Sequence, residues 1–276
     1  MPSHKDGKME VIIASSPQQI GTIAADYVEN LISTKPAAVL GVATGSSPLG
    51  LYAELGRRVD AGTLSLAKSS AFMLDEYVGL PADHPERYRT FIERHFVAAT
   101  DIDTNNVHGP DGAADNIEQA CAAYEQAIRD AGGVDLQILG VGTDGHIAFN
   151  EPGSSLASRT RLKSLMEQTR KDNARFFGGD IDAVPHHCVT QGVGTIMEAR
   201  HLVLLASGEG KAEAIRGVVE GPVSAICTGS ILQMHPQATV IIDEAAASKL
   251  AYADYYKFAY ANKPDWQRPV CTSRGR

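Results

Sequence analysis

The 276-residue sequence contains only four cysteines, and their spacing suggests neither a disulfide framework nor a metal site. They are widely separated and form no C-x-x-C pair: Cys121, Cys188, Cys227 and Cys271. Disulfide-rich secreted domains and zinc-binding modules both depend on closely spaced cysteines. We therefore expect these residues to be ordinary thiols in a reducing compartment.

Long apolar runs and basic clusters are also missing. No stretch approaches the roughly 18 apolar residues that a membrane-spanning helix needs, and residues 1–7 lack the apolar centre of a secretory signal. The formal net charge is −8, without the basic runs that bind nucleic-acid phosphates. We therefore expect a cytoplasmic protein with no membrane or nucleic-acid partner, which must hold any anionic ligand through local groups.

Short apolar runs alternate with longer amphipathic segments, which is typical of β-α units around a mostly parallel sheet. The expected strands are Glu10–Ala14, Ala38–Ala43, Ala71–Leu74, Leu136–Val141, Leu202–Ala206 and Thr239–Ile242. The expected helices are Pro17–Ile32, Leu49–Ala61, Tyr88–Phe96, Ile117–Asp130, Lys211–Val219 and Glu244–Tyr260. No repeat or linker divides the chain, so the sequence predicts a single α/β domain over residues 1–276. The segment 147–187 does not fit this pattern, and a connection of that length is often a functional lid.

Polar groups follow four of the predicted strands, at the edge where open α/β sheets bind their ligands. These groups are Thr44–Pro48 after the second strand, Asp75-Glu76 after the third, Gly142–His146 after the fourth and Ser207–Lys211 after the fifth. Gathered on one rim, they would supply hydroxyls, backbone amides, carboxylates, an imidazole and an ammonium group.

The turn made of Thr44, Gly45, Ser46 and Ser47 leads into a predicted helix that Pro48 is suited to start. Free backbone amides at such a helix start, together with the serine hydroxyls, can form an anion cradle. The alternative is that Thr44 or Ser46 only caps the helix, which is the commoner role of these residue types.

Lys211 is open to the same two interpretations, as a solvated lysine at a helix start or as a phosphate contact. The glycines Gly208 and Gly210 just before it favour the contact.

Nucleotide-binding motifs do not explain these segments. Residues 140–145 match G-x-G-x-x-G, but residues 147–152 cannot open a long helix, and a Walker A loop would need glycine in place of Leu205.

The spacing Asp144-x-His146, with Glu151 five residues later, is the most chemically suggestive pattern. Carboxylates near an imidazole can orient it and stabilise its protonated form, so this histidine could transfer protons. The alternative is an Asp-Gly turn followed by a hydrogen-bonded histidine. Asp75-Glu76 could likewise be a solvated pair at a strand end.

A metal site is a third interpretation of the same region. His146, Asp144, His186 and His187 are all possible ligands. No recognised ligand spacing appears among them, so the sequence predicts no metal site.

Several longer segments together resemble the glucosamine-6-phosphate deaminase family over most of the chain. They are residues 74–80 (LDEYVGL), 84–86 (HPE), 140–152 (GVGTDGHIAFNEP), 154–160 (SSLASRT) and 219–222 (VEGP). The resemblance implies a Rossmann-like, mostly parallel sheet with helices on both faces, no metal or organic cofactor, and homo-oligomers that are often hexamers. It also implies conversion of glucosamine 6-phosphate to fructose 6-phosphate and ammonia, as in N-acetylglucosamine catabolism.

The resemblance further implies roles for individual residues. Asp75 would move a proton between C2 and C1 of the sugar, and His146 would open the sugar ring with the help of Asp144 and Glu151. The substrate phosphate would be bound by a set of six residues: Thr44, Gly45, Ser46, Ser47, Arg175 and Lys211.

In allosteric members of this family, N-acetylglucosamine 6-phosphate binds a second site, whose positions match Ser154, Arg161 and Lys163. Three side chains depart from the family pattern: Ser164 for threonine, Lys257 for tyrosine, and Arg87 where a small polar residue is common. The chain also extends before its first strand. Two other functions stay open, a related sugar-phosphate hydrolase such as a 6-phosphogluconolactonase and a non-catalytic sugar-phosphate sensor.

Overall fold

A computed structural model describes residues 9–264 and residue 267. The N-terminal extension over residues 1–8 and the thiol of Cys271 lie outside the described residues. The remaining three cysteines are free thiols.

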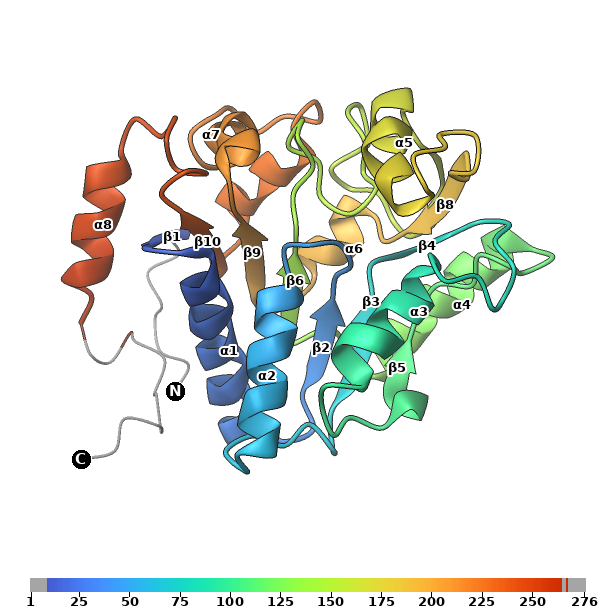
Figure 1. Ribbon diagram of the computed structural model, residues 1–276, viewed down its shortest axis with the longest axis horizontal. Helices are drawn as coiled ribbons and strands as arrows, with labels where there is room; N and C mark the ends of the chain where they lie inside the picture. The colour runs from blue at the N-terminus through green and yellow to red at the C-terminus, as the bar shows by residue number, and fades with distance from the viewer. Residues whose placement is uncertain (1–8, 265–266, 268–276) are drawn as a thin grey trace.

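A seven-stranded parallel sheet forms the centre of the fold, in the order β1-β10-β9-β6-β2-β3-β5 (Figure 1). Its strands are β1 (Glu10–Ala14), β2 (Val39–Val42), β3 (Ser70–Met73), β5 (Val107–His108), β6 (Leu136–Leu139), β9 (Leu202–Ala206) and β10 (Ala238–Asp243). Every residue of β2, β6, β9 and β10 is buried. Full burial is expected for parallel strands covered by helices on both faces.

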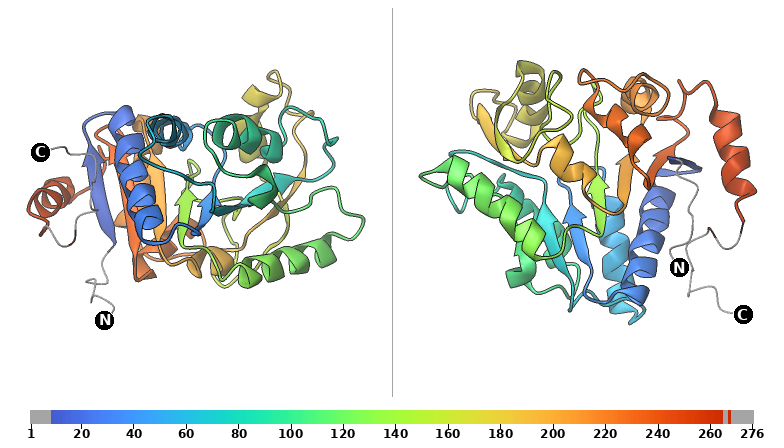
Figure 2. Two further views of the ribbon diagram at one scale, coloured as in Figure 1. Left: turned by 90° about the horizontal axis from the view of Figure 1, so that it is seen from below. Right: turned by 180° about the vertical axis from the view of Figure 1, so that it is seen from behind.

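The helices form layers on the two faces of this sheet. Figure 2 shows α1 (Pro17–Thr34), α2 (Leu49–Asp60) and α3 (Tyr88–Ile92) on one face and α4 (Ile117–Asp130) on the other. The remaining helices are α5 (Glu167–Asn173), α6 (Val193–Met197), α7 (Ala212–Val219) and α8 (Ala253–Ala261). Short 3₁₀ helices cover Thr104–Asn106, Ala174–Phe176, Glu209–Lys211 and Thr228–Met234. The Rossmann-like α/β fold implied by the resemblance is thus confirmed.

Close contact between α1 and α2 fixes the start of α2, and with it one wall of the crevice above the sheet. A Cβ atom on Gly21 would lie 2.5 Å from the carbonyl group of Gly50, so the two helices can approach this closely only through glycine. The same N-terminal end of α1 is capped by Ser16, whose hydroxyl accepts a hydrogen bond from the backbone N–H of Gln19.

A small antiparallel sheet and α5 lie above the carboxyl ends of the main strands (Figure 1). Its strands are β4 (Asp75–Tyr77), β8 (His187–Thr190) and β7 (Arg161–Ser164), in the order β4-β8-β7. Beneath it lies a second apolar cluster made of Tyr77, Phe149, Leu165, Ala174, Val184 and Cys188. The segment that did not fit the β-α pattern therefore contributes β7, α5 and the start of β8.

Two predicted helices differ from the structure. The helix expected at Glu244–Tyr260 begins only at Ala253. The preceding residues form turns next to the Asp243 carboxylate, which accepts hydrogen bonds from the backbone N–H groups of Ala246 and Gly208. The helix expected at Tyr88–Phe96 changes at Glu93 into a π-helical turn, Glu93–Val97.

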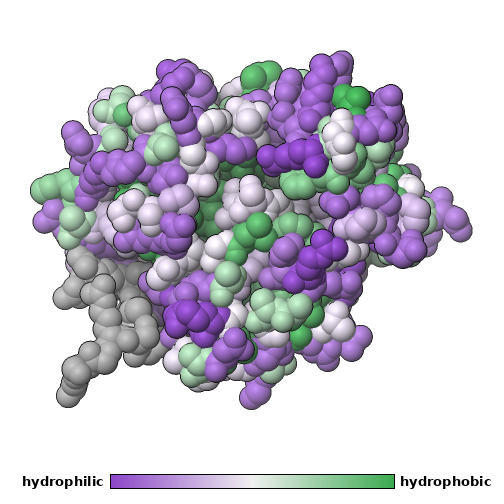
Figure 3. Space-filling view, viewed as in Figure 1, coloured by the Kyte–Doolittle hydropathy of each residue, from purple (hydrophilic) through white to green (hydrophobic). Residues whose placement is uncertain are grey.

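Polar side chains cover most of the face seen in Figure 3, and apolar side chains gather there only in small areas. Within the described part of the chain, none of the helices has both the length and the apolar character needed to cross a bilayer.

Candidate active site

The crevice that holds the candidate site lies where the strand order reverses, between β2 and β6. From β2 the chain proceeds through β3 to β5 on one side, whereas from β6 it proceeds through β9 and β10 on the other. Loops that leave neighbouring strands in opposite directions open a crevice at such a switch point. A cavity of about 560 Å³ opens there, within the usual size range of small-molecule sites.

All four polar strand ends predicted from the sequence line this one cavity. Of the ten residues assigned to catalysis and phosphate binding, nine line it: Thr44, Gly45, Ser46, Ser47, Asp75, Asp144, His146, Arg175 and Lys211. Glu151 is buried behind them, close to His146. The chemistry suggested by separate segments of the sequence is therefore brought to one place.

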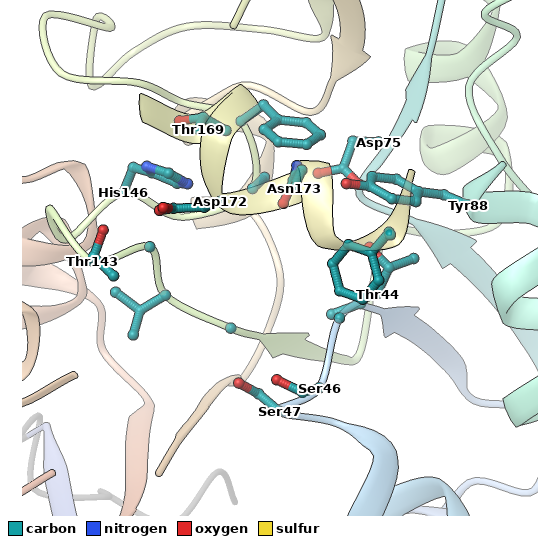
Figure 4. Close-up of a pocket in the computed structure, with 18 of the residues that line it drawn as sticks. Thr44, Ser46, Ser47, Asp75, Tyr88, Thr143, His146, Thr169, Asp172 and Asn173 are labelled. Atoms are coloured by element: carbon teal, nitrogen blue, oxygen red, sulfur yellow. The ribbon is translucent and has the colours of Figure 1, made fainter. Parts of the chain in front are cut away.

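Among the described residues, the hydroxyls of the Thr44–Ser47 turn have no hydrogen-bond partner, so they can bind a ligand. Gly45 has φ +90°, a left-handed conformation that favours glycine. Pro48 is the residue that precedes α2, one position earlier than expected, and no side chain caps this helix start. The interpretation of Thr44 or Ser46 as a helix cap is thus wrong. Figure 4 shows the hydroxyls of Ser46 and Ser47 side by side.

Two cations line the same cavity. The Lys211 ammonium donates a hydrogen bond of 2.7 Å to the carbonyl oxygen of Val141, which holds it beside the loop that follows β6. Burial lowers the pKa of Lys211, while the charge of Asp172 acts in the opposite direction. Arg175 follows α5 and is exposed, with its guanidinium 4.7 Å from the centre of the Phe176 ring.

Asp75 is the most strongly perturbed carboxyl group of the cavity. It begins β4, pairs with Thr190 of β8, and is only 6% exposed. Burial, reinforced by the neighbouring Glu76 carboxylate, raises the pKa of Asp75 to about 8. A carboxyl group that ionises near neutral pH is a far stronger base than an ordinary aspartate, as proton abstraction from carbon requires.

His146 is oriented by a tight turn. Gly145 has φ +87°, and the backbone N–H of His146 donates to Asp144 Oδ1 at 3.1 Å. The same turn brings His146 Nδ1 within 2.7 Å of Asp144 Oδ1, a charge contact without the alignment of a good hydrogen bond. Burial raises the pKa of Asp144, but the contacts with His146 outweigh it, and the net shift is downward. The predicted Asp-Gly turn exists and is what places the imidazole.

Glu151 connects this histidine to the start of α5. It is 3% exposed, and its Oε1 accepts a hydrogen bond from the backbone N–H of Met166, just before α5. Its Oε2 lies 3.5 Å from His146 Nδ1 and has no hydrogen-bond partner in the part of the chain that the structure describes. The free lone pairs of this oxygen therefore face the imidazole.

Asp144, His146 and Glu151 are also the residues that could hold a cation, since their ligand atoms all lie within 4.8 Å of one another. His186 and His187, considered as further ligands from the sequence, are not in this group. His187 instead lies at the start of β8, 3.2 Å from the Ser164 hydroxyl.

Several cavity residues were missed by sequence reasoning. Tyr88 comes from α3, and Thr169, Asp172 and Asn173 come from α5 (Figure 4). Asn173 donates a hydrogen bond of 2.9 Å to the hydroxyl of Tyr77, so α5 is bonded to β4. These residues do not follow strands of the parallel sheet. The irregularity of the segment 147–187 signalled the three residues of α5, whereas no recognised pattern signalled Tyr88.

The three residues matched to an effector site do not line this cavity. Arg161 and Lys163 are two residues apart in β7, so their side chains point to the same face of the small sheet. Arg161 donates to Asn150 Oδ1 at 2.9 Å, and burial lowers its pKa. Ser154 is 3% exposed, and its hydroxyl has no hydrogen-bond partner among the described residues.

Both the fold and the crevice at its switch point are those of an α/β enzyme that acts on a small anionic substrate. Comparison with known proteins gives the particular family. The chain belongs to the family of glucosamine-6-phosphate isomerases and 6-phosphogluconolactonases, whose model matches residues 15–241.

Curated relatives resemble the chain over almost its whole length. It is 64% identical over 259 residues to the glucosamine-6-phosphate deaminase of Mycolicibacterium smegmatis, covering 94% of this chain and 99% of the relative. It is 63% identical to that of Beutenbergia cavernae, with the same coverage.

Solved structures agree with this placement. A structure described as a monomeric glucosamine-6-phosphate deaminase matches with a TM-score of 0.85 and 41% identity, covering 87% of this chain and 100% of that one. A 6-phosphogluconolactonase from Trypanosoma cruzi matches with a TM-score of 0.72 and 22% identity over 90% of this chain and 99% of that one, a likeness of fold alone.

Proposed function

We propose that this chain converts glucosamine 6-phosphate and water to fructose 6-phosphate and ammonia. The observation that carries the proposal is the meeting, in one cavity, of a carboxyl group that ionises near pH 8, an imidazole held by carboxylates, and two cations. Relatives with 55–64% identity over 94% of the chain are named as deaminases of this substrate.

Each group in the cavity has a step that suits its chemistry. His146, supported by Asp144 and Glu151, exchanges a proton with the ring oxygen, which opens the pyranose. Asp75 then takes the proton from C2 and, after that proton has exchanged with water, delivers one to C1, which converts the aldose skeleton to a ketose and leaves an imine that water hydrolyses to ammonia. Positioned acid-base groups of this kind contribute about 10²–10⁴-fold in rate.

The phosphate of the substrate is held by the Thr44–Ser47 turn together with Arg175 and Lys211. A hydrogen bond between charged groups contributes about 1.5–3 kcal/mol, enough to anchor the sugar over the acid-base groups. The reaction itself depends on the carboxylates and on His146.

A 6-phosphogluconolactonase is the alternative enzyme, and it would use the same phosphate site. It would have no use for a base held over a carbon atom, which is the role that burial of Asp75 favours. A non-catalytic sensor is the second alternative, and it would retain substrate binding without turnover.

The purified protein should release ammonia and fructose 6-phosphate in equal amounts from glucosamine 6-phosphate, without added metal or nucleotide. Ammonia is measured with a coupled dehydrogenase and fructose 6-phosphate by chromatography. Failure to form both products at saturating substrate would reject the proposal, and hydrolysis of 6-phosphogluconolactone instead would favour the lactonase.

We further propose a cytoplasmic role in N-acetylglucosamine catabolism, which agrees with the free thiols of Cys121, Cys188 and Cys227. N-acetylglucosamine 6-phosphate is proposed as an effector at Ser154, Arg161 and Lys163. Sigmoidal kinetics that this ligand makes hyperbolic would support that site, whereas an unchanged hyperbola would exclude it. Assembly into homo-oligomers stays a prediction from the resemblance.

A further inference from the structure

Glu76, the neighbour of the proposed base, is a buried carboxylate that connects β4 to the start of α3. It is 1% exposed. Its Oε1 accepts hydrogen bonds from the backbone N–H groups of Tyr77 at 2.9 Å and Tyr88 at 3.0 Å, and its Oε2 accepts one from Arg89 at 3.0 Å. Accepting three N–H groups is the pattern of an ionised carboxylate, and the first N–H groups of a helix have no partner within the helix. Glu76 therefore holds a negative charge in a fixed place.

That charge lies next to Asp75 in the chain and acts on it directly. The remaining titratable groups that interact with Asp75 come from three neighbouring elements and from β4 itself: Tyr88 of α3, Tyr124 of α4, Cys188 of β8 and Tyr77. Burial raises the pKa of each of these groups, so all four are neutral near pH 7. Glu76 is the charged group that, after burial, keeps the proton on Asp75.

The same carboxylate also fixes a wall of the cavity. Tyr88 is the first residue of α3, and its side chain lies beside Asp75 in the cavity (Figure 4). Its hydroxyl donates to the hydroxyl of Tyr77 at 3.3 Å. Because Glu76 binds the N–H groups at the start of this helix, a change at Glu76 would move Tyr88 as well.

Arg87 moderates this charge. Its Nε lies 3.6 Å from Glu76 Oε2, and its Nη1 donates to the carbonyl oxygen of Ala82 at 3.0 Å. The arginine is one of the departures from the family pattern noted in the sequence. Its position next to Glu76 places a positive charge where it can oppose the action of Glu76 on Asp75.

We propose that Glu76 is a positioning residue that makes Asp75 a stronger base and holds Tyr88 in the cavity wall. The inference depends on the proposed role of Asp75. Glu76 makes no contact with substrate in this proposal. A change at Glu76 should therefore alter the pH dependence of the reaction more than it alters substrate binding.

The test compares pH profiles of kcat/KM for the wild type, Glu76→Gln, Glu76→Asp and Arg87→Gln. Dividing each variant's profile by that of the wild type cancels the ionisations of the substrate, which are the same for every enzyme. Glu93→Gln is the matched control, because it removes an equal charge from the helical segment that follows Tyr88, where Glu93 pairs with Arg89 at the surface.

Glu76→Gln should move the acid limb to lower pH by about one unit, the size expected when a like charge next to a carboxyl group is removed. Glu76→Asp keeps the charge but cannot reach the helix start, so its kcat should fall while its acid limb stays above that of Glu76→Gln. Arg87→Gln should move the limb to higher pH, and Glu93→Gln should leave it unchanged.

An acid limb that stays in place in Glu76→Gln, or falls equally in Glu76→Asp, would overturn the proposal. If Glu76→Gln does not fold, the Arg87→Gln variant tests the proposal instead. The proposal expects its acid limb to move to higher pH, so a limb that stays in place or moves to lower pH would overturn it. Asp75→Asn separates the two levels of inference. Full activity of Asp75→Asn would refute the role of the base itself, whereas an inactive Asp75→Asn with an unmoved Glu76→Gln profile would refute only the role of Glu76.

Discussion

Replacing Asp75 by asparagine should stabilise the protein, and the gain should grow with pH. The carboxyl group is 6% exposed and ionises at about pH 8 in the folded chain, against an ordinary value of 3.8. Between these two values the unfolded chain releases a proton that the folded chain keeps. The stability that this carboxyl group supplies is therefore fully present below its unfolded pKa and is lost as pH rises through the folded one.

The size of the effect follows from the width of this window. Each pKa unit corresponds to about 1.4 kcal/mol, so the wild type should lose roughly 4 kcal/mol relative to Asp75→Asn between pH 4 and pH 7. Asparagine does not titrate, and its amide has nearly the same shape. The variant should thus be inactive but more stable, as expected where a buried charge serves catalysis.

Urea denaturation followed by circular dichroism at pH 4, 5, 6 and 7 measures this difference directly. Asp172→Asn is the control, because this carboxylate lines the same cavity but is exposed and bonded to Gln168. Its difference from the wild type should stay nearly constant. A constant difference for Asp75→Asn over the whole range would refute the reasoning about the buried carboxyl group.

Three further predictions concern the rest of the site. Lys211→Gln should raise KM about 10–100-fold with a smaller change in kcat, since one charge-assisted bond is lost; an unchanged KM in steady-state kinetics would exclude Lys211 as a phosphate ligand. His146→Gln should lower kcat about 10²–10⁴-fold at an unchanged melting temperature, and a loss below tenfold would contradict its role. Gly145→Ala should lower both the melting temperature and kcat, because its Cβ would lie 2.4 Å from Cys227 Sγ at φ +87°. Gly62→Ala, at φ +69° with open space around it, should cost less stability, and equal losses would show that backbone strain alone matters.

Much of the fold and site could be predicted from the sequence because both depend on local patterns. The strands Glu10–Ala14 and Leu202–Ala206 have the predicted bounds, since a buried parallel strand is a continuous apolar run. The chemistry-bearing residues could be found because parallel strands present their carboxyl ends on one edge.

The remaining features depend on contacts between distant segments. The strands of the small sheet have three or four residues each, and β4 pairs with β8 more than a hundred positions away, which no local pattern indicates. Turns replace the expected helix after Asp243, whose carboxylate accepts a hydrogen bond from Gly208, 35 positions earlier. The proposed role of Glu76 could likewise not be predicted from the sequence. An acidic pair at a strand end is usually solvated, and only the structure shows that α3 covers this one. The extent of the domain over residues 1–276 stays a prediction.

The central claim is that Asp75 moves a proton between carbon atoms of the bound sugar. It is tested most directly by incubating wild type and Asp75→Asn with saturating glucosamine 6-phosphate in D₂O and analysing the product by NMR. The account predicts fructose 6-phosphate with deuterium at C1 from the wild type, and substrate binding without product from Asp75→Asn. Product formed by Asp75→Asn at the wild-type rate would contradict it.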